Sequence, residues 1–249
     1  MTHVCNRSHT AQPTIKKMTR RVVITGCSAL TPAGHGKHDI LEHLTKGTSG
    51  VKKLKHDALY AKYIDAGVFG SVDYRVDYDF RRRDRKTMGP VSYYACQVAK
   101  EALAMAGPGE AFITSGRMGV AFGSTHGSPL VQRALYRALF DDTYPGYSSI
   151  KASDYLKFMV HTTAVNITKM FGITGRVISS CTACTTSSQS IGFGYEMIKY
   201  GMQDAMLCGG ADEYDMSTVA VFDNLMACST EYNETPHLTP RPFDRDRDG

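Results

Sequence analysis

The sequence predicts an α/β fold in which helices are layered on a largely parallel sheet. Short β-branched or apolar runs have the length of strands, and longer segments with helical periodicity separate them. Strands that alternate with helices along a chain connect most simply as parallel neighbours, with the helices packed on the faces of the sheet. The predicted strands are 21–26, 118–122, 176–180 and 205–208, and the predicted helices are 38–46, 90–106, 163–171 and 187–200.

Each predicted strand runs into a turn signal. The first ends at Gly26, and the second enters a loop rich in glycine and serine at 123–129. The third leads into the turn that carries Cys184, and the last reaches Gly209 and Gly210. These turns bound segments short enough for buried strands.

Glycines mark the ends of the predicted helices. The clearest helix is 90–106, because Pro90 suits a first helical position and Gly107 with Pro108 forms a stop signal. The other helices close at Gly47, Gly172 and Gly201. The predicted apolar faces consist of Ile40, Leu41 and Leu44 in the first helix, Val91, Tyr94, Ala95, Val98, Ala102 and Met105 in the second, and Ile191, Tyr195 and Ile198 in the last.

The composition is that of a soluble globular protein. The 249 residues are 42% hydrophobic and 21% charged, which permits a sizeable core in one large domain or two small ones. Seven scattered cysteines form no disulfide framework, so a reducing cytoplasm is expected. No apolar run reaches the roughly 18–20 residues of a membrane span, and no secretory signal is evident. The net charge of +5 favours an acidic partner.

The N-terminus is interpreted as a disordered basic leader, residues 1–19, before a domain at 20–249. An over-extended start is the related alternative, since Met18 could initiate translation, and a transit-like peptide is a weaker one. The first 21 residues contain no acidic residue and five basic ones, Arg7, Lys16, Lys17, Arg20 and Arg21.

Cys184 is the leading candidate for a catalytic residue. It lies between a predicted strand and a predicted helix, where the helix dipole and unpaired backbone N–H groups favour a thiolate. Small neighbouring residues leave room for a substrate. An inert core cysteine is the alternative, and the C-x-x-C pair with Cys181 could also indicate redox or zinc chemistry. A structural zinc site usually needs four ligands, and the chain has no second such pair.

Other candidate sites each have a simple structural alternative. Residues 81–86 hold five positive charges, which could form a solvated face or a docking patch for an acidic partner. No nucleic-acid-binding motif accompanies them, so nucleic acid is not expected. The loop at Gly123–Gly127 could hold a phosphate or let a substrate chain pass close to the backbone. His126 and His161 are more typical of loop or core histidines than of metal ligands, and no cofactor or metal site is predicted.

Several motifs together resemble one enzyme family. The segment from Thr182 through Cys184 to Gly192 resembles the active-site signature of the β-ketoacyl-acyl carrier protein synthases, condensing enzymes of the thiolase fold. Further segments match in order and spacing over about residues 20–249. These are 21–26, Gly123-Ser124, 208–213, 228–233 and 241–249. The resemblance implies a thiolase-like fold with layered helices on a mostly parallel, mixed sheet.

The resemblance also implies roles for individual residues in fatty-acid biosynthesis. Cys184 would take an acyl chain from an acyl carrier protein as a thioester, with its own backbone N–H as one oxyanion donor. A carbanion from malonyl-carrier protein would then attack that thioester. The acyl pocket would be lined by Gly123, Ser124 and His126, where a polar histidine disfavours deep apolar insertion. The acidic carrier would dock on Arg83 and Lys86, and less certainly on Arg82 and Lys151.

One departure limits the expected activity. In the family, two catalytic histidines, a lysine and the second oxyanion donor come from the second half of the chain, and no matching motif occurs here. The sequence is therefore interpreted as an N-terminal half, a fragment or one product of a split gene, which alone condenses little or nothing. It is expected to form a homodimer or to pair with a C-terminal half. The alternative is a non-catalytic carrier-binding subunit, like the chain-length factors of polyketide or aryl-polyene synthases.

Overall fold

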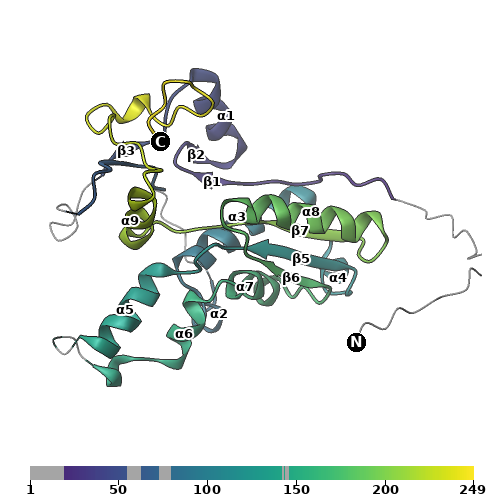
Figure 1. Cartoon of the computed structure of the whole chain (residues 1–249). Coiled ribbons are helices and arrows are strands. Elements are labelled where there is room, and N and C mark those ends of the chain that lie inside the picture. Colours follow the sequence, from purple (N-terminus) through teal and green to yellow (C-terminus); the bar gives the residue numbers. More distant parts are fainter. Residues whose placement is uncertain (1–19, 55–62, 73–79, 142, 144–145) are drawn as a thin grey trace, which may run out of the picture.

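The computed structural model describes residues 20–54, 63–72, 80–141, 143 and 146–249 (Figure 1). The predicted basic leader at 1–19 lies outside the described residues. Most of the described chain surrounds one central sheet, and a group of shorter elements near the C-terminus lies beside it (Figure 1).

The central sheet consists of three parallel strands in the order β6-β5-β7, which confirms the predicted parallel arrangement. These strands are β5 (Met118–Gly123), β6 (Val177–Ser180) and β7 (Ala205–Gly210). In the register, Val120 of β5 lies opposite Val177 on one side and Leu207 on the other. All six residues of β5 are buried, as expected for the middle strand.

The two faces of β5 are packed differently because successive side chains point to opposite faces. Met118, Val120 and Phe122 belong to the main core cluster with residues of α3 (Pro90–Ala106) and α7 (Thr162–Phe171). The alternating positions hold glycine or alanine. On that side α8 (Thr186–Lys199) approaches closely, and α7 and α8 lie on opposite faces of the sheet (Figure 1).

The predicted helices are confirmed within one or two residues. α3 has both predicted ends, α7 begins one residue early, and α1 (Gly36–Lys46) begins two residues before the prediction. Gly47, Gly107 and Gly172 all take the left-handed conformation at the helix ends. Glycine pays no steric penalty there, which is why the sequence marks these ends so clearly.

The predicted core stripe of α3 is only partly correct. Val91 and Ala95 are buried as expected, but Met105 is exposed, and buried positions also include Ser92, Cys96, Ala99 and Leu103. α3 has apolar residues on two faces. The face with Tyr94, Val98 and Ala102 is half-buried, and the face toward α7 forms the core. In α1, Leu41 and Leu44 are exposed, so the predicted apolar face of this helix is not buried among the described residues. Ile191 and Tyr195 of α8 are exposed as well.

The predicted strand at 21–26 is wrong. The segment runs without assigned secondary structure along α3 and α8, and Ile24 is 87% exposed. A Cβ at Gly26 would lie 2.2 Å from the Ala102 carbonyl oxygen, and the Cys27 N–H contacts the Met105 sulfur at 3.4 Å. The neighbour is thus a helix whose backbone groups already pair within the helix, so no strand ladder forms there.

The remaining elements surround this core. α5 (Pro129–Phe140) and α6 (Ala152–Phe158) pack together at the lower left of Figure 1, away from the sheet.

Among the described residues, every helix is too short or too polar to cross a membrane. The bounds are α2 (Arg82–Arg85), α4 (Glu110–Ile113), α5 (Pro129–Phe140), α6 (Ala152–Phe158) and α9 (Met216–Asn224). The antiparallel pairs are β1 (Leu30–Thr31) with β2 (Gly34–His35) and β3 (Lys52–Lys53) with β4 (Val68–Phe69), and 3₁₀ turns span Tyr147–Ser149, Ala183–Thr185 and Pro236–Leu238.

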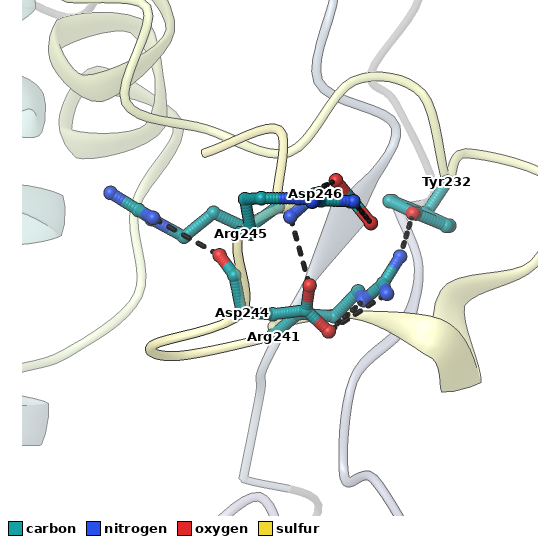
Figure 2. Close-up of polar contacts among 6 residues, drawn as sticks. Tyr232, Arg241, Asp244, Arg245 and Asp246 are labelled. Carbon is teal, nitrogen blue, oxygen red and sulfur yellow. Dashed lines mark hydrogen bonds and ion pairs between the residues drawn. The ribbon is translucent and has the colours of Figure 1, made fainter.

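Two motif segments near the C-terminus fold onto each other. Figure 2 shows Arg241 between the carboxylate of Asp244, to which it donates at 2.8 Å, and the hydroxyl of Tyr232. Asp248 accepts hydrogen bonds from the Thr230 and Glu231 backbone N–H groups, both at 2.8 Å. Segments 228–233 and 241–249 therefore form one polar unit.

Candidate active site

Cys184 lies in a tight turn between β6 and α8. β6 ends at Ser180, a 3₁₀ turn covers Ala183–Thr185, and α8 begins at Thr186. The strand–turn–helix order predicted from the sequence is therefore confirmed. The thiol of Cys184 is exposed, as is that of Cys181. Both residues are therefore in contact with solvent.

The turn is held by a compact set of hydrogen bonds. Ala183 has a φ of 50°, a left-handed conformation that alanine rarely adopts and that costs about 1–2 kcal/mol. The buried Thr186 hydroxyl donates to the Ala183 carbonyl at 2.7 Å and accepts from the Thr182 N–H at 2.8 Å. Thr185 closes the turn through its N–H, which donates to the Thr182 carbonyl at 3.2 Å. These contacts fix the backbone on both sides of Cys184.

The loop after β5 lies against this turn. A Cβ at Gly123 would lie 2.2 Å from the Ser180 carbonyl oxygen and 2.3 Å from the Thr186 methyl group, so only glycine permits the approach. The Cys181 thiol donates to the Thr125 carbonyl at 3.6 Å. The structure thus brings the predicted acyl-pocket loop and the predicted nucleophile together.

The three predicted pocket residues differ in their surroundings. Gly123 is buried at the end of β5. Ser124 is fully buried, and its hydroxyl donates to Asp212 at 3.0 Å and accepts from the Gly127 N–H at 2.9 Å. His126 is exposed at the tip of the loop. Of the three, only His126 presents its side chain to solvent.

The predicted docking residues lie on two short helices. Arg82, Arg83 and Lys86 are exposed in and just after α2, and Lys151 is exposed at the start of α6. The acid inside the basic run, Asp84, is buried and takes part in ion pairs that tie α2 to its surroundings. Its partners are Arg81 at 2.7 Å, Arg83 at 3.8 Å and Lys169 of α7 at 3.9 Å.

The other described cysteines divide into exposed and buried thiols. Burial, with a further contribution from Asp84, raises the pKa of Cys96 to about 12. Burial raises the pKa of Cys208 to about 11, and it also raises that of Cys228. Cys27 is exposed. The buried Cys96 and the half-buried Cys208 are therefore expected to stay protonated at neutral pH.

Two acids that follow β7 were not identified as functional from the sequence. Asp212 accepts from the Thr125 N–H at 2.8 Å as well as from Ser124. Glu213 is buried and accepts from the Val91 N–H at 2.9 Å and the Leu130 N–H at 3.2 Å, so one carboxylate joins the N-termini of α3 and α5. Their position in the sequence was the available signal, because residues directly after a parallel strand lie at the edge of the sheet where binding sites form.

A zinc site at Cys181 and Cys184 would require further ligands. Within the described ranges, no three side chains of histidine, cysteine, aspartate or glutamate gather as a metal-binding cluster. The two thiols therefore have no third partner for a zinc ion in this part of the chain.

Comparisons with known proteins agree with the motifs. A family model described as "Beta-ketoacyl synthase, N-terminal domain" matches residues 19–249. The 3-oxoacyl-[acyl-carrier-protein] synthase 1 of Escherichia coli (strain K12) is 32% identical over 237 residues, covering 92% of this chain and 56% of the relative. The chain thus spans about half the length of the curated relatives that it matches.

Solved structures show the same fold. A β-ketoacyl synthase from Burkholderia phymatum STM815 is 39% identical with a TM-score of 0.83, covering 91% of this chain and 55% of that one. A type II polyketide ketosynthase, solved with its acyl-carrier protein and bound to a hexaketide, is 25% identical with a TM-score of 0.75, covering 93% and 55%. These likenesses confirm the α/β fold as that of the ketosynthases. The chain belongs to the β-ketoacyl synthase family, whose N-terminal domain it contains.

Proposed function

We propose that this chain supplies the acyl-accepting half of a β-ketoacyl-acyl carrier protein synthase in fatty-acid biosynthesis. The observation that carries the proposal is the exposed Cys184 thiol on a tight turn at the start of α8. Its match to the family's active-site signature and the 32% identity to a 3-oxoacyl-carrier protein synthase support it.

The first chemical step is acyl transfer. The Cys184 thiolate attacks the carbonyl carbon of an acyl-carrier thioester, and the carbon–sulfur bond to the carrier breaks. The carrier leaves as a thiolate and takes up a proton, so Cys184 holds the acyl chain as a new thioester. The backbone N–H of Cys184, in the first turn before α8, is proposed to stabilise the developing oxyanion.

The acyl chain is proposed to lie along the loop after β5. Gly123 and Ser124 shape this loop from inside, and the exposed His126 faces the solvent side. An imidazole there favours a short chain or one with polar groups, because an unpaired polar group disfavours deep apolar burial.

The acidic carrier is proposed to dock on the exposed basic residues Arg83 and Lys86, with Arg82 and Lys151 as secondary contacts. Their positive charge complements an acidic partner. Such complementarity speeds association and orients the two proteins, and it has a smaller effect on the final affinity. The polyketide relative whose structure includes its acyl-carrier protein supports the class of partner.

Condensation requires groups beyond Cys184. The family's decarboxylating histidines have no matching motif in this sequence, so we propose that the chain alone accepts an acyl group but elongates it little. Apolar side chains exposed on α8 and after α9, among them Ile191, Tyr195, Leu225 and Met226, support pairing with a C-terminal half or with a second copy.

The test is elongation of an acyl-carrier protein with malonyl-carrier protein. The assay uses this chain alone, and then with the C-terminal half of the E. coli relative supplied as a separate polypeptide. We expect little product alone and clear product after reconstitution. An inactive reconstituted complex in which Cys184 is chemically intact would argue against the enzymatic role.

The competing proposal is a non-catalytic carrier-binding subunit. Chain-length factors usually lack the cysteine, so the exposed Cys184 weighs against that reading. Carrier binding without any adduct on Cys184 would favour it. A reversible disulfide between Cys181 and Cys184, or stoichiometric zinc in the purified protein, would instead favour thiol redox or metal chemistry.

A further inference from the structure

Thr125 connects the loop after β5 to the turn that carries Cys184. Its hydroxyl lies 3.3 Å from the carbonyl oxygen of Ala183, the residue directly before Cys184. We propose that Thr125, anchored by Asp212, is a positioning residue for Cys184. This inference rests on the proposed acyl transfer at Cys184 and adds to it two residues that act through the backbone of the turn.

The Ala183 carbonyl is the point where two hydroxyls converge. Thr186 donates from α8 at 2.7 Å, and Thr125 contacts the same oxygen from the neighbouring loop at 3.3 Å. The Thr186 backbone N–H also donates to this oxygen, so Thr186 contacts it twice and Thr125 once. The Thr186 bonds are internal to the turn. The Thr125 contact joins the turn to a second segment of the chain.

The conformation of Ala183 explains why an outside contact matters. A residue with a Cβ remains at a φ of 50° only where its surroundings hold it there. Without the Thr125 contact, only Thr186 would hold the carbonyl, and the peptide plane between Ala183 and Cys184 would rotate more easily. That plane carries the Cys184 N–H, the proposed oxyanion donor, so the contact helps to fix the direction of this group.

Asp212 fixes the position of Thr125. Its carboxylate accepts the Thr125 N–H at 2.8 Å, the Ser124 hydroxyl at 3.0 Å and the Thr125 hydroxyl at 3.2 Å. The Thr125 hydroxyl has one proton, which it shares between Asp212 and the Ala183 carbonyl at nearly equal distances. The hydrogen bond from the Thr125 N–H to Asp212 keeps the Thr125 hydroxyl close to the Ala183 carbonyl, whichever of the two acceptors takes the hydroxyl proton.

A second contact reinforces the connection. The Cys181 thiol donates to the Thr125 carbonyl at 3.6 Å, so Thr125 meets both ends of the 181–184 turn. Asp212 follows β7, Thr125 follows β5, and Cys181 follows β6. The carboxyl ends of all three parallel strands are thus joined by hydrogen bonds that reach Ala183, the residue before Cys184.

The decisive variants are Thr125→Val and Thr125→Ser. Valine keeps the shape of threonine without its hydroxyl, and serine keeps the hydroxyl without the methyl group. With octanoyl-carrier protein as the probe, Thr125→Val should slow acylation of Cys184 about 10-fold. Thr125→Ser should stay within about threefold of the unsubstituted chain. Asp212→Ala should resemble Thr125→Val, and the double variant should be no slower, because both changes act through one contact.

Two further measurements separate positioning from general damage. Alkylation by iodoacetamide needs only an accessible thiolate, so its rate at Cys184 and the pH profile of that rate should hardly change in Thr125→Val. Amide hydrogen exchange at 182–185 should accelerate in Thr125→Val and not in Thr125→Ser.

Each outcome has a definite meaning for the proposal. Unchanged exchange at 182–185 in Thr125→Val would overturn the positioning role, whether or not Cys184 is acylated. Equal losses of acylation and alkylation without rescue by serine would also overturn it. If exchange responds as expected while the unsubstituted chain is never acylated, the contact stands and the proposed function fails.

Discussion

Gly194 of α8 lies directly against Cys208 of β7, and a Cβ on Gly194 would meet the Cys208 sulfur at 2.1 Å. This contact sets how closely the helix that begins beside Cys184 approaches the sheet. A Cβ on Gly192, two residues earlier in the same helix, would meet nothing within 4 Å apart from its chain neighbours and the nearby backbone of its own helix. The pair therefore separates packing from helix propensity within one helix.

Gly194→Ala should destabilise the protein, and Gly192→Ala should stabilise it. Overpacking against the half-buried Cys208 side chain costs about 1–3 kcal/mol, and the better helix propensity of alanine offsets about 1 kcal/mol of this cost. Without the clash, Gly192→Ala retains only that gain of about 1 kcal/mol. Urea unfolding of both variants measures the difference. Equal shifts would contradict the close packing of α8 on β7.

The contrast between these glycines shows what the sequence could not provide. Pro90 and Gly107 mark both ends of α3 locally, and so this helix was predicted at its true bounds. The prediction of a strand at 21–26 was wrong because an apolar run does not indicate whether the segment will lie beside a strand or beside a helix. The contacts of Asp212 with Ser124 and Thr125 join residues 87 or 88 positions apart, a separation beyond any local pattern.

Charge reversal at the proposed docking residues should weaken carrier binding. Arg83→Glu combined with Lys86→Glu should raise the dissociation constant for an acyl-carrier protein about 10-fold at low salt, with a smaller effect at high salt. The matched control is Lys37→Glu, an exposed lysine on α1. Isothermal titration at two salt concentrations gives the comparison. Equal effects of the control and the double variant would indicate a general charge effect.

The buried thiol of Cys96 should make the protein less stable at alkaline pH. Burial raises its pKa from the ordinary 9.0 to about 12, so the folded state favours the protonated thiol. The contribution of the protonated Cys96 thiol to the free energy of unfolding is complete below pH 9, and it is lost as the pH rises from 9 toward 12. The loss is about 1.4 kcal/mol for each pH unit.

The measurement is the free energy of unfolding in urea at pH 8, 9.5 and 10.5. Cys96→Ala lowers the stability at every pH by leaving a small cavity, but it should flatten the alkaline decline. The same slope in both proteins would show that Cys96 does not titrate in this way.

Glu101 should anchor the extended N-terminal segment to α3. Burial alone would raise the pKa of Glu101, but hydrogen bonds from Ser28, Gln97 and His35 hold the pKa below its ordinary value. The stabilisation that the Glu101 carboxylate gives the folded protein is present above pH 4.5, the ordinary pKa of the group. It is lost as the pH falls through the lower pKa that Glu101 has in the folded state.

Glu101→Gln should therefore destabilise the protein by about 1–2 kcal/mol at pH 7 and by less at pH 4. It should also speed trypsin cleavage within 20–37, which contains Arg20, Arg21 and Lys37. Glu110→Gln, at the start of α4, is the control. Equal cleavage of the two variants would contradict the anchoring role.

The most direct test of the account is the site of acylation. The chain is incubated with octanoyl-carrier protein, and the acylated peptide is identified by mass spectrometry alongside Cys184→Ser and Cys181→Ala. The account predicts one octanoyl group on Cys184, its retention in Cys181→Ala and its loss in Cys184→Ser. An octanoyl group on another cysteine, or none on Cys184 while iodoacetamide still labels that thiol, would contradict it.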